Sequence, residues 1–212
     1  MLQLFYSPGA CSLVTHIALE ESGADYEAIR VVLAEGEHHT PEFLAINPHA
    51  RVPALRTQRG IITENIAILN FVADEFQSDG SVPRGDAYAA AKCNELLGWF
   101  AATVHISFAQ VWRAERFTRE VGVHEAIIAG GRENLASQFL EIEERSSNDW
   151  LVGSGFTAAD AYAATFFRWG KRIDFDMSQY PRWAALCARA IERSAVRKVI
   201  DNEALQADAF HP

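Results

Sequence analysis

The sequence predicts two parts with different architectures, an α/β part followed by an all-α part. In the first third of the chain, short apolar runs bounded by turn residues alternate with segments whose apolar residues have helical spacing. A segment rich in Ser, Gly and Pro (QSDGSVPRGD) then separates two helical patterns, and beyond it no convincing strand pattern occurs. We therefore expect an α/β domain over 1–76, a linker over 77–86 and an all-α domain over 87–212.

In the α/β part we expect the order strand, helix, strand, short helix, strand, strand, helix. The first strand, Leu2–Tyr6, ends at a Ser-Pro-Gly turn, and the helix after it is long enough to cross over to a parallel second strand. Gly60 separates the third and fourth strands as a hairpin. The expected elements cover residues 2–6, 11–21, 26–33, 41–46, 51–56, 61–63 and 64–76.

In the all-α part the apolar spacing predicts a series of helices. Thr157 and Asp160 open one of them as a variant of the capping box, in which the hydroxyl and the carboxylate satisfy free amides at the helix start. The expected helices cover residues 88–116, 121–145, 158–172, 183–193 and 195–202.

Composition and charge argue against several classes of function. Hydrophobic residues make up 49% of the 212 residues, which is enough for a proper core. No apolar run approaches the roughly 20 residues that span a bilayer. The net charge of -9 gives no basic surface for nucleic acid. The N-terminus has no basic region before its apolar part, so we expect a strand there and not a signal peptide.

The cysteine and histidine positions argue against a metal site. The three cysteines, Cys11, Cys93 and Cys187, are far apart and odd in number, so neither a disulfide framework nor a zinc cluster is indicated. The histidines show no metal-ligand spacing. We expect a reducing, cytoplasmic setting and no metal, nucleic-acid or membrane partner.

Cys11 is the sharpest local feature. It follows a strand and a turn and stands at the start of a helix, where free amides and the helix dipole are expected to lower the pKa of its thiol. The hydroxyl of Ser12 can donate a hydrogen bond to a bound sulfur. The alternative is a small, semi-buried cysteine that happens to begin a helix. The lack of a C-x-x-C motif argues against a dithiol mechanism and leaves a monothiol mechanism open.

Val52 and Pro53 open the third strand. A proline cannot donate to a strand ladder, so its position indicates a special turn or an edge position. If the bond is cis, the backbone N–H and carbonyl of Val52 become available to a ligand, which can pair with them like an added strand. The alternative is an ordinary edge-strand proline, and the sequence leaves the isomer open.

Glu64 and Asn65 begin the helix that follows the hairpin. The amide of Asn65 at this helix start can receive an anion, and Glu64 can accept from an ammonium group. Ordinary N-capping is the alternative. A thiolate-tuning helix, a strand with free backbone groups and an anion-binding helix start together form the parts of one peptide site.

A polar and aromatic stripe is expected on the long first helix of the second part. Asn94, Ala101, His105, Phe108 and Trp112 recur at helical steps and are expected to share a face. Such a stripe is more often core than pocket, and a lone histidine in it is more often structural than functional. Both interpretations remain open at this point.

These segments together resemble the beta-class bacterial glutathione transferases. The segments are LFYSPGACSLVTHIALEESG, INPHARVPAL, TENIAILNFVAD, the helix with His105, and FTAADAY, and they span nearly the whole chain. FTAADAY and the N-P-x-x-x-V-P-A-L stretch are typical of the superfamily, whereas PGACSL together with His105 indicates the beta class. The resemblance implies a thioredoxin-like first domain (βαβαββα) with a cis bond before Pro53, an all-helical second domain and a homodimer.

The resemblance also implies glutathione as co-substrate, bound across the first domain. Its thiol would lie beside Cys11 and Ser12, and its cysteinyl backbone would pair with Val52. Its γ-glutamyl end would reach Glu64 and Asn65. No metal is implied.

The second domain would complete this site. His105 would approach the sulfur, and Tyr6, Phe108 and Trp112 would line the pocket for a small apolar electrophile. The resemblance leaves the electrophile unidentified, and detoxification, catabolism and redox repair all remain open as the physiological role.

The sequence departs from the beta-class pattern at several positions that bear on glutathione binding. Asn65 stands where Ser or Thr is usual, although an asparagine amide can still donate to a carboxylate. Ile106 replaces a common lysine and Gly98 replaces a common asparagine. The loop over 34–40 is short and has no lysine. These changes weaken the polar contacts expected for glutathione and leave the fold untouched.

Three hypotheses follow. The leading one is a transferase that lowers the thiol pKa of glutathione and delivers the thiolate to an apolar electrophile, with Cys11 serving mainly in binding. The second is a glutathione-dependent thiol-disulfide reductase that requires Cys11. The third is a non-catalytic ligand-binding or scaffold protein of the same fold.

Overall fold

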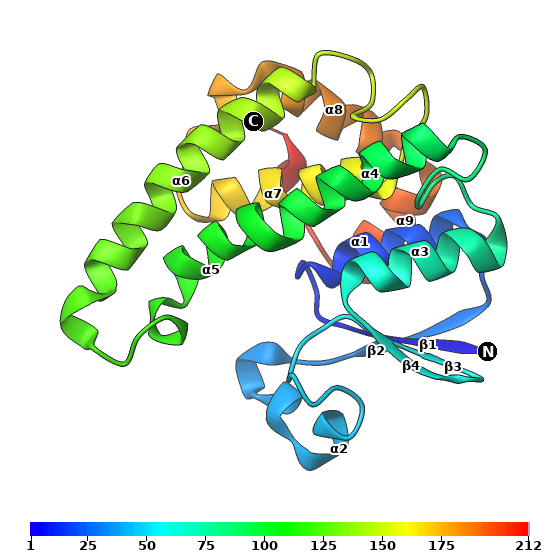
Figure 1. Ribbon diagram of the computed structural model, residues 1–212, viewed down its shortest axis with the longest axis horizontal. Coiled ribbons are helices and arrows are strands. Elements are labelled where there is room, and N and C mark those ends of the chain that lie inside the picture. Colours follow the sequence, from blue (N-terminus) through cyan, green and yellow to red (C-terminus); the bar gives the residue numbers. More distant parts are fainter. Residues whose placement is uncertain (212) are drawn as a thin grey trace.

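A four-stranded mixed sheet forms the centre of the first part, and the computed structural model describes residues 1–211. The elements are β1 (Leu2–Tyr6), α1 (Ser12–Glu21), β2 (Tyr26–Arg30), α2 (Pro41–Leu44), β3 (Ala54–Thr57), β4 (Gly60–Thr63) and α3 (Asn65–Phe76). The strand order is β2-β1-β3-β4, with β1 parallel to β2 and antiparallel to β3. Helices α1 and α3 cover one face and α2 lies beyond the other (Figure 1). The expected βαβαββα order and the parallel crossover are confirmed.

Two strands are shorter than expected, each for a local reason. β2 ends at Arg30, because the N–H of Val32 donates to the Glu37 carboxylate at 2.6 Å and the chain turns into a 3₁₀ helix there. β3 begins at Ala54 and not at position 51. The preceding proline has no N–H to donate, so the ladder cannot extend through it.

The second part is entirely helical apart from its connections. Its helices are α4 (Ala87–Trp99), α5 (His105–Trp112), α6 (His124–Arg145), α7 (Ala158–Arg172), α8 (Pro181–Glu192) and α9 (Ser194–Asn202). The single helix expected over 88–116 is interrupted, because Phe100–Val104 is π-helical and Arg113 leaves the helix with φ -145°. Helices α5 and α6 pack against each other and project beyond the sheet (Figure 1).

The π-helical turn corrects the expected stripe along this helix. Asn94 accepts a hydrogen bond from Asn70 of α3 at 2.8 Å, whereas His105 contacts Tyr162 and Trp169 of α7. An extra residue in a π turn shifts the phase of all side chains that follow it. Asn94 and His105 therefore contact different helices and do not share one face.

The segment expected as a linker, 77–86, is a packed connection. It contains no helix or strand, but Ser81 and Val82 have no exposed surface. The carbonyl of Ser81 accepts from the N–H of Ala158, and its hydroxyl donates to the carbonyl of Leu69, both at 2.8 Å. These bonds join α3 to the start of α7 across the segment.

The larger of two hydrophobic clusters runs through both parts, and the smaller one includes Phe5, Phe43 and Val52. Helix α1 packs on α3 within the first part and on α7 and α9 in the second. Leu4 of β1, Leu13 of α1 and Phe166 of α7 belong to the same buried cluster. At the start of α7 the expected capping box is confirmed. The Thr157 hydroxyl accepts from the N–H of Ala159, and the Asp160 carboxylate accepts from the N–H of Thr157. Docking of α1 thus positions the turn before it against α7.

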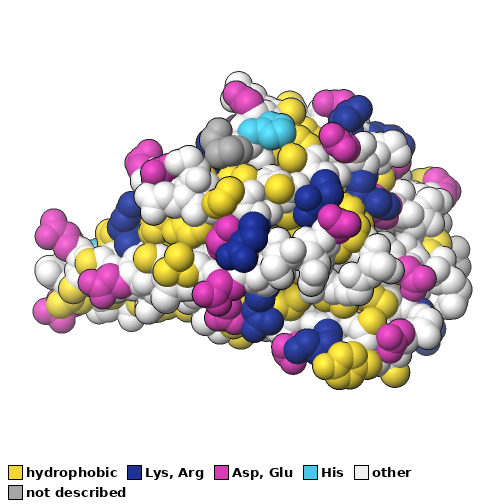
Figure 2. Space-filling model, turned by 90° about the horizontal axis from the view of Figure 1, so that it is seen from above, with side chains coloured by type: hydrophobic (Ala, Val, Ile, Leu, Met, Phe, Trp, Pro, Cys, Tyr) yellow, Lys and Arg dark blue, Asp and Glu magenta, His cyan; other side chains and the backbone are white. Residues whose placement is uncertain are grey.

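The surface carries charges of both signs. The face shown in Figure 2 mixes acidic and basic side chains with scattered hydrophobic ones. Over residues 1–211, none of the helices is long and apolar enough to cross a membrane.

Candidate functional site

The turn that precedes Cys11 is held by groups from the second part. The N–H of Gly9 donates to the Glu203 carboxylate at 2.7 Å. The carbonyl of Gly9 accepts from the indole N–H of Trp169 at 2.8 Å and from Arg168 at 3.2 Å. Gly9 has φ +64°, and a Cβ there would lie 2.5 Å from the Arg168 guanidinium. This position therefore favours glycine, and residues of α7 together with Glu203 just after α9 hold the turn in place.

Cys11 lies partly buried at the start of α1, but its thiol is not activated in the way we expected. Sγ donates to the carbonyl of Val52 at 3.4 Å. Burial raises the pKa of the Cys11 thiol to about 12, and the charge of Glu64 raises it further. A hydrogen bond from the backbone N–H of Cys11 and the positive charges of Arg113 and Arg51 lower that pKa, but the effect of burial is larger. The expectation of a lowered pKa was wrong, because the loss of hydration outweighs the helix dipole.

Ser12 does not present its hydroxyl to a ligand. Its side chain has no exposed surface, and the hydroxyl donates to the carbonyl of Ser7 at 3.2 Å while accepting from the N–H of Ser7 at 3.1 Å. A hydroxyl has one proton to donate. The structure thus corrects the expected role, since this proton closes the turn over Ser7 and Cys11 and is not free for a bound sulfur.

The Val52-Pro53 peptide bond is cis, as the resemblance implied. Buried Asn47 fixes the approach to it by donating from Nδ2 to the carbonyl of Arg51 at 2.7 Å. Within residues 1–211 the N–H of Val52 has no protein acceptor, while its carbonyl accepts from the Cys11 thiol. This backbone N–H is the donor that pairing with an extended ligand requires.

Glu64 and Asn65 have different orientations at the start of α3. Glu64 has φ +69° and makes no capping bond, and its carboxylate forms no ion pair with any residue in 1–211. The Asn65 side chain is buried, donating to the carbonyl of Cys11 at 3.0 Å and accepting from Thr15 at 2.6 Å. The side-chain amide of Asn65 is therefore not available to a ligand carboxylate, whereas the backbone N–H at this helix start is.

His105 begins α5 and contacts two side chains of α7. Its Nδ1 lies 3.3 Å from the hydroxyl of Tyr162, and its ring lies 5.2 Å from that of Trp169 between centroids. Burial lowers the pKa of His105 to about 4, and the positive charges of Arg116, Arg113 and Arg51 lower it further. Above pH 5 this imidazole is therefore neutral, so one ring nitrogen donates a hydrogen bond and the other accepts one.

The three aromatic residues expected to line one pocket lie in different places. Tyr6 is buried beneath α1, with its ring 4.9 Å from that of His16. Phe108 has no exposed surface. Trp112 stacks on Phe108 at 5.2 Å between centroids and is 37% exposed. The structure corrects the expectation for Tyr6 and Phe108, which are core residues, and leaves Trp112 as the one of the three that a ligand can contact.

Two family models match the chain, the Glutathione S-transferase N-terminal domain over residues 1–74 and the Glutathione S-transferase C-terminal domain over residues 125–194. A curated relative, glutathione S-transferase GstA of Escherichia coli O157:H7, is 30% identical over 97% of this chain and 100% of its own. The chain belongs to the glutathione S-transferase family. Its relatives in that family are enzymes by name, which agrees with the expected fold and class of activity.

Two solved structures are similar to this glutathione transferase over nearly its whole length. A glutathione transferase homologue from Sulfitobacter with bound glutathione has a TM-score of 0.89 and 32% identity, covering 95% of this chain and 98% of its own. A beta-class enzyme from Sphingomonas chungbukensis has a TM-score of 0.82 and 30% identity, covering 96% of this chain and 100% of its own.

The low pKa of His105 predicts a pH-dependent stability for this glutathione transferase. The pKa is about 4 in the folded chain and 6.5 in an ordinary histidine, so the unfolded chain takes up the proton first. Stability is therefore lost as pH falls from 6.5 to 4, by about 3 kcal/mol in total. Urea unfolding of the wild type and His105→Asn at several pH values measures the difference between them.

Asp160 provides the reason for comparing two proteins at each pH. Burial raises the pKa of its carboxyl to about 6, which stabilises the folded chain as pH falls and opposes the effect of His105. Both proteins contain Asp160, so its contribution cancels in the difference. Parallel curves for wild type and His105→Asn over this range would contradict the assignment.

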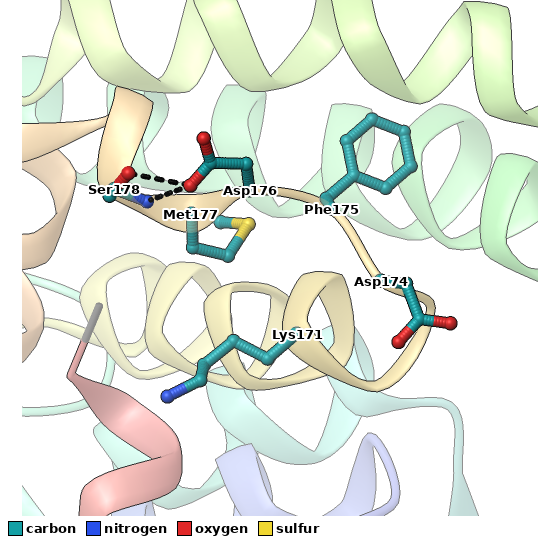
Figure 3. Close-up of a pocket in the computed structure, with 6 residues that line it drawn as sticks. All are labelled: Lys171, Asp174, Phe175, Asp176, Met177 and Ser178. Atoms are coloured by element: carbon teal, nitrogen blue, oxygen red, sulfur yellow. Dashed lines mark hydrogen bonds between the residues drawn. The ribbon is translucent and has the colours of Figure 1, made fainter.

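Two cavities of this glutathione transferase lie apart from the site around Cys11. One of about 370 Å³ lies past the end of α7 and is lined by Lys171, Asp174–Met177 and Ser178 (Figure 3). Another of about 360 Å³ lies between the β3–β4 hairpin and Phe71 of α3. None of the residues expected at the site lines either cavity. No cluster of metal-ligating side chains occurs over residues 1–211.

Several residues around the site escaped the sequence analysis. Tyr162, Trp169 and Glu203 contact His105 or Gly9 from the second part. Tyr162 lies inside FTAADAY, where we used the capping box and the family motif but gave this tyrosine no role. Glu203 has no local signal at all, because its role depends on α9 packing against α1.

Proposed function

We propose that this chain is a beta-type glutathione transferase that binds glutathione across its first part and transfers the glutathione thiolate to an electrophile. The observation that carries the proposal is the 3.4 Å contact between Cys11 Sγ and the carbonyl of Val52. It brings the start of α1 against the cis peptide bond, beside the unpaired carboxylate of Glu64. Family membership and the glutathione bound to the Sulfitobacter homologue support this interpretation.

Each group has a role in the proposed complex. The N–H of Val52 donates to the peptide backbone of glutathione, and the backbone N–H of Asn65 donates to its γ-glutamyl carboxylate. Glu64 accepts from the α-ammonium group. The free N–H groups in the first turn of α1 stabilise the sulfur anion, and the thiol proton passes to solvent. Neutral His105 completes the surroundings of the sulfur without supplying a strong base.

The proposal also includes the position of the electrophile, the oligomeric state and the cellular location. The electrophile lies where the two parts meet, beside His105 and the exposed Trp112. The enzyme acts as a homodimer in the cytoplasm.

Two measurements test this proposal. Calorimetric titration of the reduced protein with glutathione is expected to give a dissociation constant between micromolar and low millimolar. Cys11→Ala is expected to keep conjugating activity within about tenfold of wild type and to lose the ability to form a mixed disulfide with glutathione. The absence of binding up to about 10 mM, repeated in an independent assay, would overturn the proposal.

The same variant separates the transferase from the monothiol reductase. A reductase needs the Cys11 thiolate as nucleophile, and a pKa of about 12 leaves almost none of it at neutral pH. Conjugation that falls by about a thousandfold in Cys11→Ala would contradict the binding role of Cys11, whereas disulfide reduction that disappears in this variant would favour the reductase.

A further inference from the structure

The charges of Arg51, Arg113 and Arg116 act on His105, and the guanidinium of Arg172 lies over the ring of Trp112. We refer to these four residues, which come from three segments, as the arginine group. All four are exposed, and within residues 1–211 none of their side chains forms an ion pair or donates a hydrogen bond. The chain has 28 acidic residues against 19 Lys and Arg, and the face in Figure 2 mixes side chains of both signs. Four unpaired cations in one region therefore need an explanation.

The backbone and the aromatic contacts bring the arginine group to the site. The guanidinium of Arg172 lies over the Trp112 ring, 5.7 Å from its centroid, and Arg113 follows Trp112 directly in the chain. The N–H of Arg116 donates to the carbonyl of Arg113 at 3.0 Å. Arg51 precedes Val52, whose carbonyl contacts the Cys11 thiol.

Three members of the arginine group, Arg51, Arg113 and Arg116, lie near enough to His105 for their charges to act on it. Arg116, Arg113 and Arg51 all lower the pKa of His105 after burial, and Arg51 and Arg113 also lower the pKa of Arg116. Of the nearby carboxylates, Glu115 opposes this effect on Arg116. Glu64 is assigned to the ammonium group of glutathione in the proposed complex. Like charges that nearby carboxylates compensate only in part destabilise the free protein, so an anion that joins them relieves repulsion.

We infer that the second substrate carries a carboxylate or sulfonate on an apolar body, the body resting on Trp112 and the anion held by the arginine group. This inference rests on the proposed function and narrows it, since we expected an apolar electrophile from the sequence. The planar fork of a guanidinium matches a carboxylate or sulfonate with two parallel hydrogen bonds. Trp112 supplies apolar surface beside Arg172, as its exposed fraction of 37% allows.

A matched pair of electrophiles tests the inference. One is uncharged, 2-chloro-1,3-dinitrobenzene, and the other is the same ring with a carboxylate para to chlorine, 4-chloro-3,5-dinitrobenzoate. In both, the glutathione sulfur bonds to the carbon that bears chlorine, and chloride leaves with the electron pair of the broken bond. The readout is the ratio of kcat/KM for the anion to kcat/KM for the uncharged compound, after subtraction of the uncatalysed rates.

The ratio is expected to fall about tenfold in Arg116→Gln and in Arg172→Gln, because each removes a charge-assisted hydrogen bond. Arg172→Lys keeps the charge and should recover part of the loss. Arg59→Gln is the matched control, an exposed arginine in the turn between β3 and β4, and should leave the ratio within about twofold. High salt should lower the ratio in the wild type. An unchanged ratio in both test variants would overturn the inference.

Glutathione has a glycyl carboxylate of its own, so the same arginines could serve it instead. In that case the variants would raise KM for glutathione and leave the ratio unchanged, which also overturns the inference. A second measurement distinguishes failure of the inference from failure of the proposed function. It compares the binding of 3,5-dinitrobenzoate and of 1,3-dinitrobenzene in the absence of glutathione. If neither electrophile is conjugated but the benzoate alone binds, and binds more weakly to Arg172→Gln, the proposed function fails and the anion site stands.

Discussion

Glu203→Ala is expected to lower the free energy of unfolding by about 3 to 5 kcal/mol, a large share of the stability of an ordinary domain. The Glu203 carboxylate is 3% exposed and accepts from the N–H of Gly9 at 2.7 Å and from Nδ1 of His16 at 2.8 Å. Its removal leaves two buried donors without an acceptor. Urea unfolding measures the loss, and glutathione binding should weaken as well because the turn before Cys11 is no longer held.

Two control variants sharpen this prediction. Glu203→Gln keeps one acceptor oxygen for Gly9 and is expected to lie between wild type and the alanine variant. Glu141→Ala removes an exposed partner of Arg145 on α6, and such i,i+4 pairs contribute about 0.5 kcal/mol or less. If Glu203→Ala costs no more than Glu141→Ala, the carboxylate does not hold the turn.

Phe108→Ala is the second substitution with a large expected effect, again about 3 to 5 kcal/mol of unfolding free energy. Phe108 has no exposed surface, and its ring lies between 5.2 and 5.9 Å, centroid to centroid, from those of Trp112, Phe139, Phe166 and Trp169. Truncation would leave a cavity among rings that are held by different helices. Urea unfolding followed by tryptophan fluorescence reports both the stability and the local change.

Phe117→Ala provides the comparison for the same change of side chain. Phe117 is 43% exposed just beyond α5, so its truncation should cost less than about 1 kcal/mol. Equal effects of the two substitutions would contradict the burial of Phe108. They would then restore Phe108 as a candidate for the electrophile pocket.

Sequence reasoning succeeded where a feature depends on near neighbours in the chain. The strand at Leu2–Tyr6 and the helix after it have their own periodicity, so their pairing with β2 followed from connection length alone. Thr157 and Asp160 are three residues apart and cap the same helix start. The cis bond before Pro53 came from a family motif and not from local reasoning.

Sequence reasoning failed where tertiary packing decides the pKa, the burial or the helix geometry of a residue. The helix start at Cys11 can stabilise a thiolate by at most about 2 kcal/mol. A pKa raised from 9.0 to about 12 corresponds to about 4 kcal/mol, and burial is its largest cause. Phe108 and Trp112 are four residues apart, yet one is core and the other is surface. The π-helical turn at Phe100–Val104 also had no signal in the spacing of apolar residues.

The bond between Gly9 and Glu203 also bears on the order in which the chain is synthesised. The two residues are 194 positions apart, so the turn before Cys11 leaves the ribosome long before its acceptor does. Until α9 has emerged and docked on α1, a nascent chain has the thiol of the site without the carboxylate that orients it. A fragment of residues 1–76 made alone would have the same gap, and glutathione binding should appear only in the complete translation product.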